Sequence, residues 1–408
     1  MRILWLKTEF LHPVDKGGRI RTYNMLRELA REHHVTYLTL DDGTAAPDAA
    51  ARASEYAHEV VRVPFAAPAR GSSAFYADLL RNAVSPLPYA IARYHSPAMR
   101  SEVERLARDE SFDVLVCDFL TPSLNVPAGL SLPTVLFQHN VEAAIWRRHF
   151  EVATHPVKRA YFREQWRRMR NWERAECRRF DHVVAVSQDD LRAFRDEYGV
   201  ARVSAVPTGV DTAYFRPSGA VERRPHNLVF TGSMDWLPNE DAIKHFVADV
   251  LPRIRREVPG VTLTVVGRNP TPAVRELAAL YDHVEVTGSV PDVRPYMERA
   301  AVFVVPIRIG GGTRLKIYEA MGMERAVVST TVGAEGLPVQ HGRDVVLADG
   351  AEGFAAATVA LLRDPAAAAA LGARGADAVR SQFGWDRVSA QFASFCAQAA
   401  AGRASSLT

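Results

Sequence analysis

A run of glycines between an apolar segment and a helical pattern is the first feature of the sequence that could do chemistry. Residues 306–322 read PIRIGGGTRLKIYEAMG, and the glycines follow the apolar run AVFVVPI. Thr313 is suited to cap a helix that continues to Gly322. Free N–H groups at a helix start attract anions, and glycines let phosphate or sugar oxygens approach the backbone. The segment therefore predicts a site for a diphosphate and the groups attached to it.

Three charged side chains lie in this loop or just after it. Arg314 and Lys316 would add positive charge beside a bound phosphate, and Glu319 could accept hydrogen bonds from the vicinal hydroxyls of a ribose. The alternative is that Glu319 is a solvated residue that pairs with Lys316 at spacing i,i+3. Spacing alone leaves both interpretations open, because a glycine-rich turn between strand and helix is weakly specific.

A second glycine pair and a histidine lie in the N-terminal half. Gly17 and Gly18 stand between an apolar run and a helical pattern in EFLHPVDKGGRIRTYNMLREL, and the alternative is that they only make a turn. The loop is not G-x-G-x-x-G, so it gives little support to a nicotinamide cofactor. The stretch TVLFQHNVEAAIW ends an apolar run with His139, Asn140 and Glu142. A single histidine at a strand end is more often structural than catalytic.

Short apolar runs alternate with longer helical patterns along the whole chain. The runs are RILWLK, VTYLTL, DVLVCDF, TVLFQ and HVVAVS in the first half, then NLVFTG, TLTVVG, VEVTG, AVFVVP and AVVST. Nearly continuous apolar strands separated by amphipathic helices indicate parallel sheets covered on both faces. The predicted fold class is α/β with two such sheets. Ligands of open α/β sheets bind beyond the carboxyl ends of the strands, so the expected site is the cleft between two domains.

A stretch rich in Pro, Gly and polar residues at 203–227 separates the two series of strands. We therefore predict an N-terminal domain over residues 1–205 and a C-terminal domain over residues 206–385. The late stretch FGWDRVSAQFASFCAQAA has apolar residues at mostly helical spacing. A C-terminal helix over residues 386–408 is expected to pack back toward the N-terminal domain.

Composition excludes several classes of protein. The chain has 408 residues, of which 48% are hydrophobic and 24% charged, as in a soluble globular protein. A net charge of +3 is far from the basic stripe of a nucleic-acid-binding protein, so no nucleic-acid partner is expected. Three widely spaced cysteines offer neither a disulfide framework nor a CxxC metal site. No run approaches the ~20 apolar residues of a membrane span, and the N-terminal run is too short for a signal peptide. We expect a cytoplasmic protein.

A basic segment raises the question of a membrane contact. Residues 158–180, KRAYFREQWRRMRNWERAECRRF, hold nine Lys or Arg against three Glu. Phe162, Trp166, Met169 and Phe180 fall on one helical face, so one interpretation is a helix with its apolar side in the core and a solvated basic side. The alternative is peripheral contact with anionic lipid headgroups at the inner face of a membrane.

Taken together, the motifs resemble those of the family 4 glycosyltransferases, which are retaining enzymes of the GT-B fold. The longest match is AVFVVPIRIGGGTRLKIYEAMGMERAVVSTTVGAEGL, residues 301–337. The others are the Gly17 and Gly18 loop, QHN, VSAVPTGVDTAYF, FTGSMDWLPNEDAI, VTGSVPDVRPYMERA and FGWD. The resemblance implies two Rossmann-like domains facing across a cleft. It also implies transfer of a sugar from a nucleotide-diphosphate sugar to an acceptor hydroxyl with retention of configuration, and no further cofactor.

The resemblance also implies roles for the residues that match the family's motifs. Glu319 would hold the donor ribose, and the Gly17 and Gly18 loop would close over the donor phosphates near the reacting carbon. His139 would face the donor sugar, where it could hydrogen-bond a hydroxyl or stabilise charge at the reacting centre; it is not assigned as a nucleophile. The remaining donor-binding candidates are Gly232, Ser233, Val290, Asp292, Gly311, Gly312, Thr313, Arg314 and Lys316, with Val290 and Asp292 near the nucleobase.

Two positions depart from the family's pattern. Gly311 stands where the family often has the first carboxylate of a Glu-x7-Glu pair, so one acceptor for a sugar hydroxyl is absent. Ser233 follows Gly232 where many members carry an Arg, with a Lys further on, to clamp the diphosphate. Arg314 and Lys316 would then be the substitute cations.

Other functions remain open at this stage. An epimerase of the same architecture would interconvert sugar nucleotides without an acceptor, a phosphorylase would need phosphate, and a non-catalytic partner subunit would only bind the donor. The chain has no Asp-x-Asp, so no chelated divalent metal is expected. The sequence does not name the nucleobase, the sugar, the oligomeric state or the acceptor, which could be a glycan, a lipid-linked compound or a small molecule.

Overall fold

The computed structural model describes residues 1–14, 17–69, 71–108, 111–309 and 315–407. The chain divides into two compact units, of which the first combines Met1–Pro207 with Asp386–Thr408 and the second is Thr208–Trp385. The divisions predicted from the sequence lie at residues 205 and 385.

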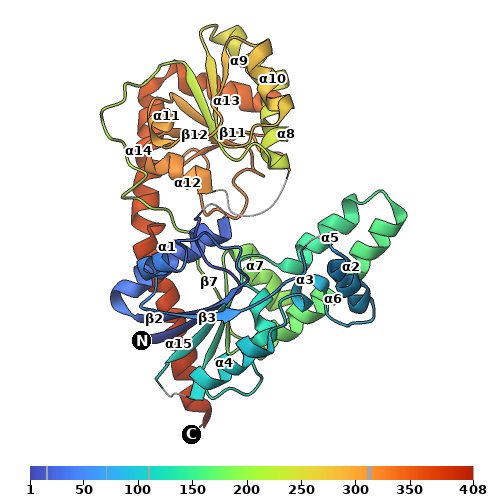
Figure 1. The fold of residues 1–408 in the computed structure, drawn as a ribbon. Coiled ribbons are helices and arrows are strands. Elements are labelled where there is room, and N and C mark those ends of the chain that lie inside the picture. Colours follow the sequence, from blue (N-terminus) through green and yellow to red (C-terminus); the bar gives the residue numbers. More distant parts are fainter. Residues whose placement is uncertain (15–16, 70, 109–110, 310–314, 408) are drawn as a thin grey trace. The chain divides into compact units, whose positions relative to one another are not determined.

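The first unit is built on a seven-stranded parallel sheet in the order β3-β2-β1-β4-β5-β6-β7 (Figure 1). Its strands are β1 (Arg2–Lys7), β2 (His34–Asp41), β3 (Glu59–Pro64), β4 (Val114–Asp118), β5 (Thr134–Phe137), β6 (His182–Ala185) and β7 (Val203–Ala205). The central strands are almost entirely buried because helices cover both faces of a parallel sheet. The carboxyl ends of β1 and β4 lie side by side, with Leu6 in register with Cys117.

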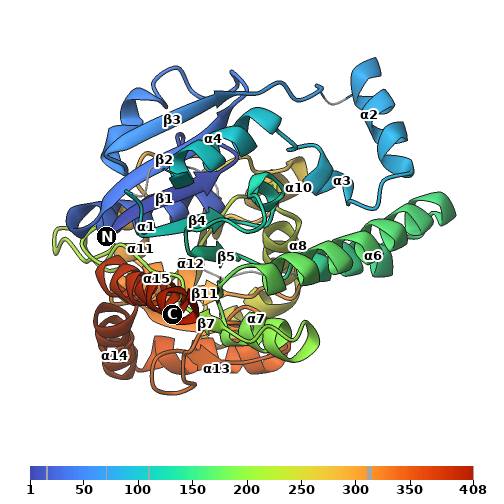
Figure 2. The ribbon, with the colours of Figure 1, turned by 90° about the horizontal axis from the view of Figure 1, so that it is seen from below.

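Helices of the first unit connect these strands and cover the sheet. They are α1 (Gly17–Glu32), α2 (Ser73–Ala83), α3 (Tyr89–Ala92), α4 (Pro97–Arg108), α5 (Glu142–Val152), α6 (Pro156–Arg179), α7 (Gln188–Arg192) and α15 (Trp385–Leu407), with short helical turns η1 (Ala51–Glu55), η2 (Thr121–Asn125) and η3 (Ala193–Glu197). Although α15 is last in sequence, it lies beside the first sheet (Figure 2). The Phe392 ring centroid is 4.8 Å from that of Phe137 and 5.5 Å from that of Trp5.

The second unit repeats the architecture with a six-stranded parallel sheet in the order β10-β9-β8-β11-β12-β13. Its strands are β8 (Asn227–Thr231), β9 (Thr262–Val266), β10 (Val284–Val286), β11 (Val302–Val305), β12 (Ala326–Ser329) and β13 (Val346–Leu347). Its helices are α8 (Leu237–His245), η4 (Phe246–Val250), α9 (Leu251–Glu257), α10 (Pro272–Leu280), α11 (Arg294–Glu298), α12 (Leu315–Gly322), α13 (Ala351–Arg363) and α14 (Pro365–Gln382). Two α/β units with parallel sheets confirm the predicted fold class.

Every apolar run quoted from the sequence contains a strand, but β3, β7 and β13 have no such run. The β7 strand lies at the start of the stretch 203–227 that separates the two series of apolar runs. Its three residues are only partly buried, and β13 has two residues, so neither is long enough for an apolar pattern. The β3 strand, EVVRVP, carries charge and is exposed at several positions because it is a sheet edge.

None of the described helices is by itself long and apolar enough to cross a membrane. One pair, α13 and α14, passes such a test only when the two helices are joined across a bend of 104°.

Candidate functional site

At the carboxyl end of β8 in the second unit, a glycine, which has no side chain, lies next to a lysine. A Cβ atom on Gly232 would lie 2.7 Å from Lys316 Nζ and 2.8 Å from Asn239 Nδ2. A Cβ on Gly267, at the end of β9, would lie 1.7 Å from the Gly232 carbonyl oxygen. Only glycine fits where two strand ends approach this closely. The two glycines therefore let α8 and α12 bring polar side chains up to the strand ends.

Lys316 lies on the first turn of α12 and is held over β8. Its ammonium group donates to Asn239 Oδ1 at 3.0 Å and lies 3.9 Å from the centroid of the Phe230 ring. The Asn239 amide in turn donates to the Ser233 carbonyl at 2.8 Å. The structure thus brings together three residues named from the sequence, Gly232, Ser233 and Lys316. Asn239 was missed, although the PNE triplet at the start of α8 placed an amide seven residues after the glycine.

Glu319 follows Lys316 on the same helix and is partly exposed. Burial raises the pKa of its carboxyl to about 7, and the Lys316 charge opposes that shift. The described contacts of Glu319 do not include an ion pair with Lys316, whose ammonium group is held by Asn239 instead. The alternative of a solvated pair at i,i+3 is therefore not what the structure shows.

The glycine loop itself, with Gly311, Gly312, Thr313 and Arg314, lies outside the described residues. Before the loop, the Ile307 carbonyl accepts from the Thr330 hydroxyl and Arg308 pairs with Asp241 of α8 at 2.7 Å. After the loop, α12 begins at Leu315 and packs through its buried residues.

Val290 and Asp292, named as candidate contacts of the nucleobase, belong to a different set of contacts. Val290 packs against the core of the second unit. Asp292 pairs with Arg294 at 2.7 Å and accepts from the Tyr214 hydroxyl at 3.3 Å. The Arg294 guanidinium lies 3.9 Å above the Tyr214 ring. The Asp292 carboxylate is therefore engaged within the protein, and a nucleobase would have to compete with Arg294 for it.

In the first unit, the carboxyl ends of β1 and β4 hold a buried ion pair. Lys7 Nζ lies 2.8 Å from Asp118 Oδ2, and both side chains are almost inaccessible. The same oxygen accepts from Thr22 Oγ1 at 2.6 Å and from Trp5 Nε1 at 3.1 Å. Burial opposes ionisation of Asp118, but the Lys7 ammonium holds the pKa of that carboxyl well below its usual range. Asp118 therefore carries a negative charge that these three donors compensate.

His139, two residues after β5, joins this cluster from the other side. Its Nε2 lies 2.8 Å from Asp118 Oδ1, and its Nδ1 has no hydrogen-bond partner among the described residues. Burial lowers the pKa of His139 to about 3, against the effect of Asp118. The imidazole is therefore neutral at physiological pH. It can exchange a hydrogen bond with a sugar hydroxyl, and its role at the reacting centre stays a prediction.

Phe119 connects His139 to the glycine pair at the start of α1. Its ring stacks on the His139 imidazole with centroids 3.8 Å apart. A Cβ on Gly18 would lie 2.9 Å from Phe119 Cζ, whereas a Cβ on Gly17 would meet nothing within 4 Å. Phe119 has a φ of 74°, which is rare for a residue with a bulky side chain. The structure thus brings Gly18 and His139 to the same ring, and Phe119 covers the imidazole.

Asp118 and Phe119 were missed as site residues because DVLVCDF was treated only as a strand. The signal was present, since a carboxylate and an aromatic ring stand at the carboxyl end of a buried parallel strand, where ligands of α/β sheets bind. Glu142 was noted only in passing. It is partly exposed at the start of α5, three residues after His139, and burial raises its pKa to about 7.

No group of three or more His, Cys, Asp or Glu side chains is arranged to hold a metal ion within the part of the chain that the structure describes. The described ionic groups of the two sites include Lys7 and Lys316, carboxylates and a histidine.

Two family models match the chain in sequence. The model of Glycosyltransferase Family 4 matches residues 16–214, and that of Glycosyl transferases group 1 matches residues 225–364. The chain belongs to the family 4 glycosyltransferases. The two matches include Gly18, Asp118 and His139 in the first unit and Gly232, Lys316 and Glu319 in the second.

One relative in sequence is the GDP-mannose-dependent alpha-(1-6)-phosphatidylinositol monomannoside mannosyltransferase of Mycobacterium tuberculosis, which is 30% identical over 238 residues. This match covers 53% of the present chain and spans 61% of the relative's length.

Two solved structures are similar over nearly the whole chain. Sucrose-phosphate synthase from Thermosynechococcus elongatus superimposes with a TM-score of 0.68 at 18% identity, covering 98% of this chain and 99% of that one. HepE from Anabaena, solved with UDP and glucose, superimposes with a TM-score of 0.65 at 15% identity, covering 97% and 98%. At these identities the similarity establishes the fold, and the GT-B architecture is confirmed.

Proposed function

We propose that the protein is a glycosyltransferase that moves a sugar from a nucleotide-diphosphate sugar to an acceptor hydroxyl with retention of anomeric configuration. One observation carries the donor assignment: the Lys316 ammonium lies against the bare backbone of Gly232 at a strand end, one helical turn from the Glu319 carboxyl. A cation beside uncovered backbone suits a diphosphate, and a carboxylate nearby suits a ribose. Retention rests on membership of the family.

In this reaction the glycosyl–phosphate bond breaks toward an oxocarbenium-like state, and charge builds up on the leaving diphosphate. Lys316 would stabilise that charge, because an ammonium group partly shielded from water interacts more strongly than one in bulk solvent. His139, being neutral, would orient the donor sugar through a hydrogen bond at Nδ1 rather than supply charge. Phe119 must then move away from the imidazole when the sugar binds.

The relatives suggest which donors to test first. The mycobacterial mannosyltransferase is named as dependent on GDP-mannose, and HepE was solved with UDP and glucose. GDP-mannose and UDP-glucose are therefore the first candidates, with acceptors drawn from glycans, lipid-linked compounds and small molecules.

A thermal-shift panel with UDP, GDP, dTDP, ADP and NAD tests the proposal. A ligand at 100 times its dissociation constant stabilises a protein by about 2.7 kcal/mol, which raises the Tm by several degrees. Stabilisation by one nucleoside diphosphate and not by NAD is the expected result. No shift with any of them contradicts the donor assignment.

Activity assays on the same protein distinguish the remaining candidate functions. Sugar transfer that requires an acceptor supports a glycosyltransferase, interconversion of sugar nucleotides without acceptor supports an epimerase, and phosphate-dependent turnover supports a phosphorylase. Donor binding without turnover under any acceptor identifies a non-catalytic subunit, the function to which the absent carboxylate at Gly311 would point. We expect turnover to survive EDTA, and its abolition contradicts a metal-independent mechanism.

A further inference from the structure

Two loops of the second unit meet at the carboxyl ends of neighbouring strands. The first loop runs from β8 to α8, and the second runs from β9 to α10. The backbone N–H of Met234 in the first loop donates to the Arg268 carbonyl in the second at 2.9 Å. The Asn269 side-chain amide donates to Asp235 Oδ2 at 3.0 Å. Because these two hydrogen bonds join the loops, the backbone of Arg268 has a fixed position beside the first loop.

The Arg268 side chain is directed toward the first loop by Ser233. The guanidinium Nε donates to Ser233 Oγ at 3.1 Å. The serine hydroxyl donates its only proton to Asp235 Oδ1 at 2.5 Å. The hydrogen bonds from Ser233 and Asn269 hold the pKa of the Asp235 carboxyl below its usual range, so this carboxyl is ionised and accepts that proton. The Ser233 oxygen is therefore oriented to accept from Arg268.

Lys316 approaches the same loop from α12. Its Nζ lies 2.7 Å from the place of a Cβ on Gly232, the residue before Ser233. Two cationic side chains from different elements thus reach consecutive residues, whose Cα atoms are about 3.8 Å apart. Ser233 is partly exposed, and its backbone N–H meets no acceptor in the part of the chain that the structure describes. Two cations close together favour an anion with more than one phosphoryl group.

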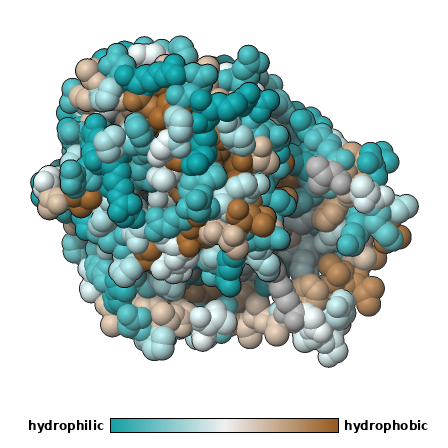
Figure 3. All heavy atoms as spheres, turned by 90° about the horizontal axis from the view of Figure 1, so that it is seen from above, coloured by the Kyte–Doolittle hydropathy of each residue, from teal (hydrophilic) through white to brown (hydrophobic). Residues whose placement is uncertain are grey.

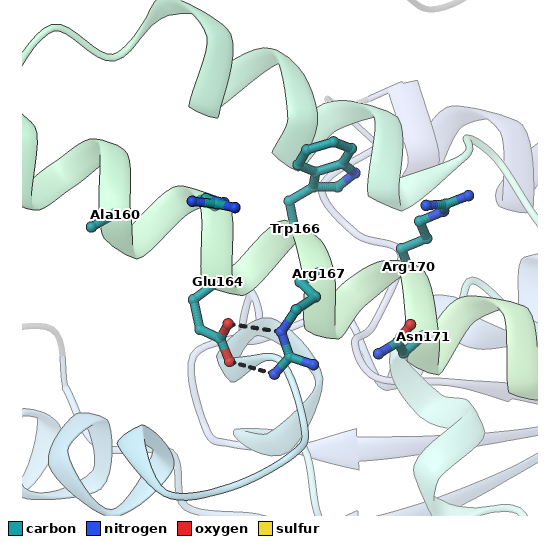
Figure 4. Close-up of a pocket in the computed structure, with 7 residues that line it drawn as sticks. Ala160, Glu164, Trp166, Arg167, Arg170 and Asn171 are labelled. Carbon is teal, nitrogen blue, oxygen red and sulfur yellow. Dashed lines mark hydrogen bonds and ion pairs between the residues drawn. The ribbon is translucent and has the colours of Figure 1, made fainter.

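An arginine at the protein surface is not by itself a ligand site. Most of the surface in Figure 3 is hydrophilic, with hydrophobic side chains in small groups. Arg163, Arg167 and Arg170 line a hollow of about 540 Å³ along α6, where Figure 4 shows Arg167 paired with Glu164. The described residues that line this hollow all belong to α6 and include no glycine. Arg268 differs from these arginines because it lies at a strand end, next to a glycine and a second cation.

We propose that Arg268 binds the diphosphate of the donor together with Lys316. Each of the two cations binds one phosphoryl group, and Ser233 positions the Arg268 guanidinium. This inference rests on the proposed function, because it assigns a further residue to the donor site. The Asp235 carboxylate opposes the binding of an anion, but both of its oxygens accept hydrogen bonds and the Arg268 charge compensates it. When charge builds up on the leaving diphosphate, the guanidinium stabilises it.

Isothermal titration calorimetry of the full chain with UDP, GDP, dTDP and ADP tests the proposal. Arg268→Gln removes the charge and keeps an amide donor, so the dissociation constant of the nucleoside diphosphate that binds should rise roughly tenfold or more. Arg170→Gln on α6 is the matched control, since it removes another exposed arginine, and should change this constant by less than about threefold. Both positions are exposed, so the variants should fold, and circular dichroism checks this.

A second control separates the charge of Arg268 from the contact between the two loops. Asn269→Gly removes the hydrogen bond to Asp235, and glycine suits the φ of 53° at this position. The dissociation constant should again change by less than about threefold.

The proposal is overturned if Arg268→Gln binds as tightly as the unaltered protein. It is also overturned if Arg170→Gln or Asn269→Gly loses as much affinity as Arg268→Gln, because the loss then reflects net charge or loop position. If the unaltered protein binds none of the four nucleotides, the donor assignment is contradicted and this proposal with it. Binding that Arg268→Gln leaves unchanged contradicts only the role of Arg268.

Discussion

The two units place polar groups at the carboxyl ends of their strands in opposite ways. In the first unit Lys7, Asp118 and His139 are almost inaccessible, and Lys7 and Asp118 bond each other while Phe119 covers the imidazole. In the second unit Lys316 and Glu319 remain partly exposed, and the lysine is positioned by an amide and an aromatic ring instead of a carboxylate.

Because of this difference, we expect the buried cluster of the first unit to contribute to stability and the partly exposed cluster of the second unit to bind ligand. A buried ion pair whose members satisfy each other is destabilising to break, because the remaining charge has no partner. A lysine held at a partly exposed strand end can lose its charge with little effect on folding, and its positive field is available to a ligand. Substitutions in the first cluster should therefore act on stability, and those in the second on donor affinity.

The largest effect is expected for Asp118→Ala. It leaves the Lys7 ammonium buried and removes the acceptor of Trp5 and Thr22, so unfolding free energy should fall by about 3–5 kcal/mol. Denaturant titration measures this free energy of unfolding. Asp292→Ala removes a carboxylate from a partly exposed pair with Arg294 and should lower the same quantity by less than about 1 kcal/mol. Equal losses of unfolding free energy in the two variants would show that burial of the Asp118 cluster does not make it more important for stability than the Asp292–Arg294 pair.

Lys316→Met should show the reverse pattern. The methionine keeps an aliphatic stem over Phe230 but has no charge, so the dissociation constant of the nucleotide-sugar should rise at least tenfold, about 1.4 kcal/mol. Unfolding free energy should change by less than about 1 kcal/mol. Isothermal titration calorimetry measures the dissociation constant. Lys244→Met, on α8 and 3.8 Å from Glu240, is the matched control and should leave donor affinity unchanged.

The sequence predicted the fold and the family more completely than the state of the sites. Apolar runs identify strands because buried parallel strands need continuous apolar side chains, and Gly232 with Lys316 followed from their motifs. Spacing cannot show that Lys7 and Asp118 meet, since 111 residues separate them and only the parallel pairing of β1 with β4 joins them. Nor could it show that His139 is neutral, because its pKa depends on burial by Phe119 and Phe137, which come from different strand ends.

The pH dependence of donor binding tests whether Glu319 binds the donor ribose. Its carboxyl, with a pKa raised by burial to about 7, is mostly protonated at pH 6 and mostly ionised at pH 8. Only the ionised form accepts two ribose hydroxyls, so affinity should increase as pH rises, by up to roughly tenfold across this interval. A nucleotide-sugar is the right probe because its diphosphate does not titrate there. Glu319→Gln should bind with no pH dependence; a slope retained in that variant would assign the titration to another group, such as Glu142.

The smallest effect compares two neighbouring glycines at the start of α1. Gly17→Ala adds a methyl group that meets nothing within 4 Å and should be neutral or stabilising by up to about 1 kcal/mol. Gly18→Ala places Cβ 2.9 Å from the Phe119 ring, which must shift against His139, so a loss of about 1 kcal/mol is expected. In a Phe119→Ala background the second substitution should have no such effect, because the ring it meets is gone. If it still destabilises there, Gly18 is required by the backbone of the helix start and not by the cover over His139.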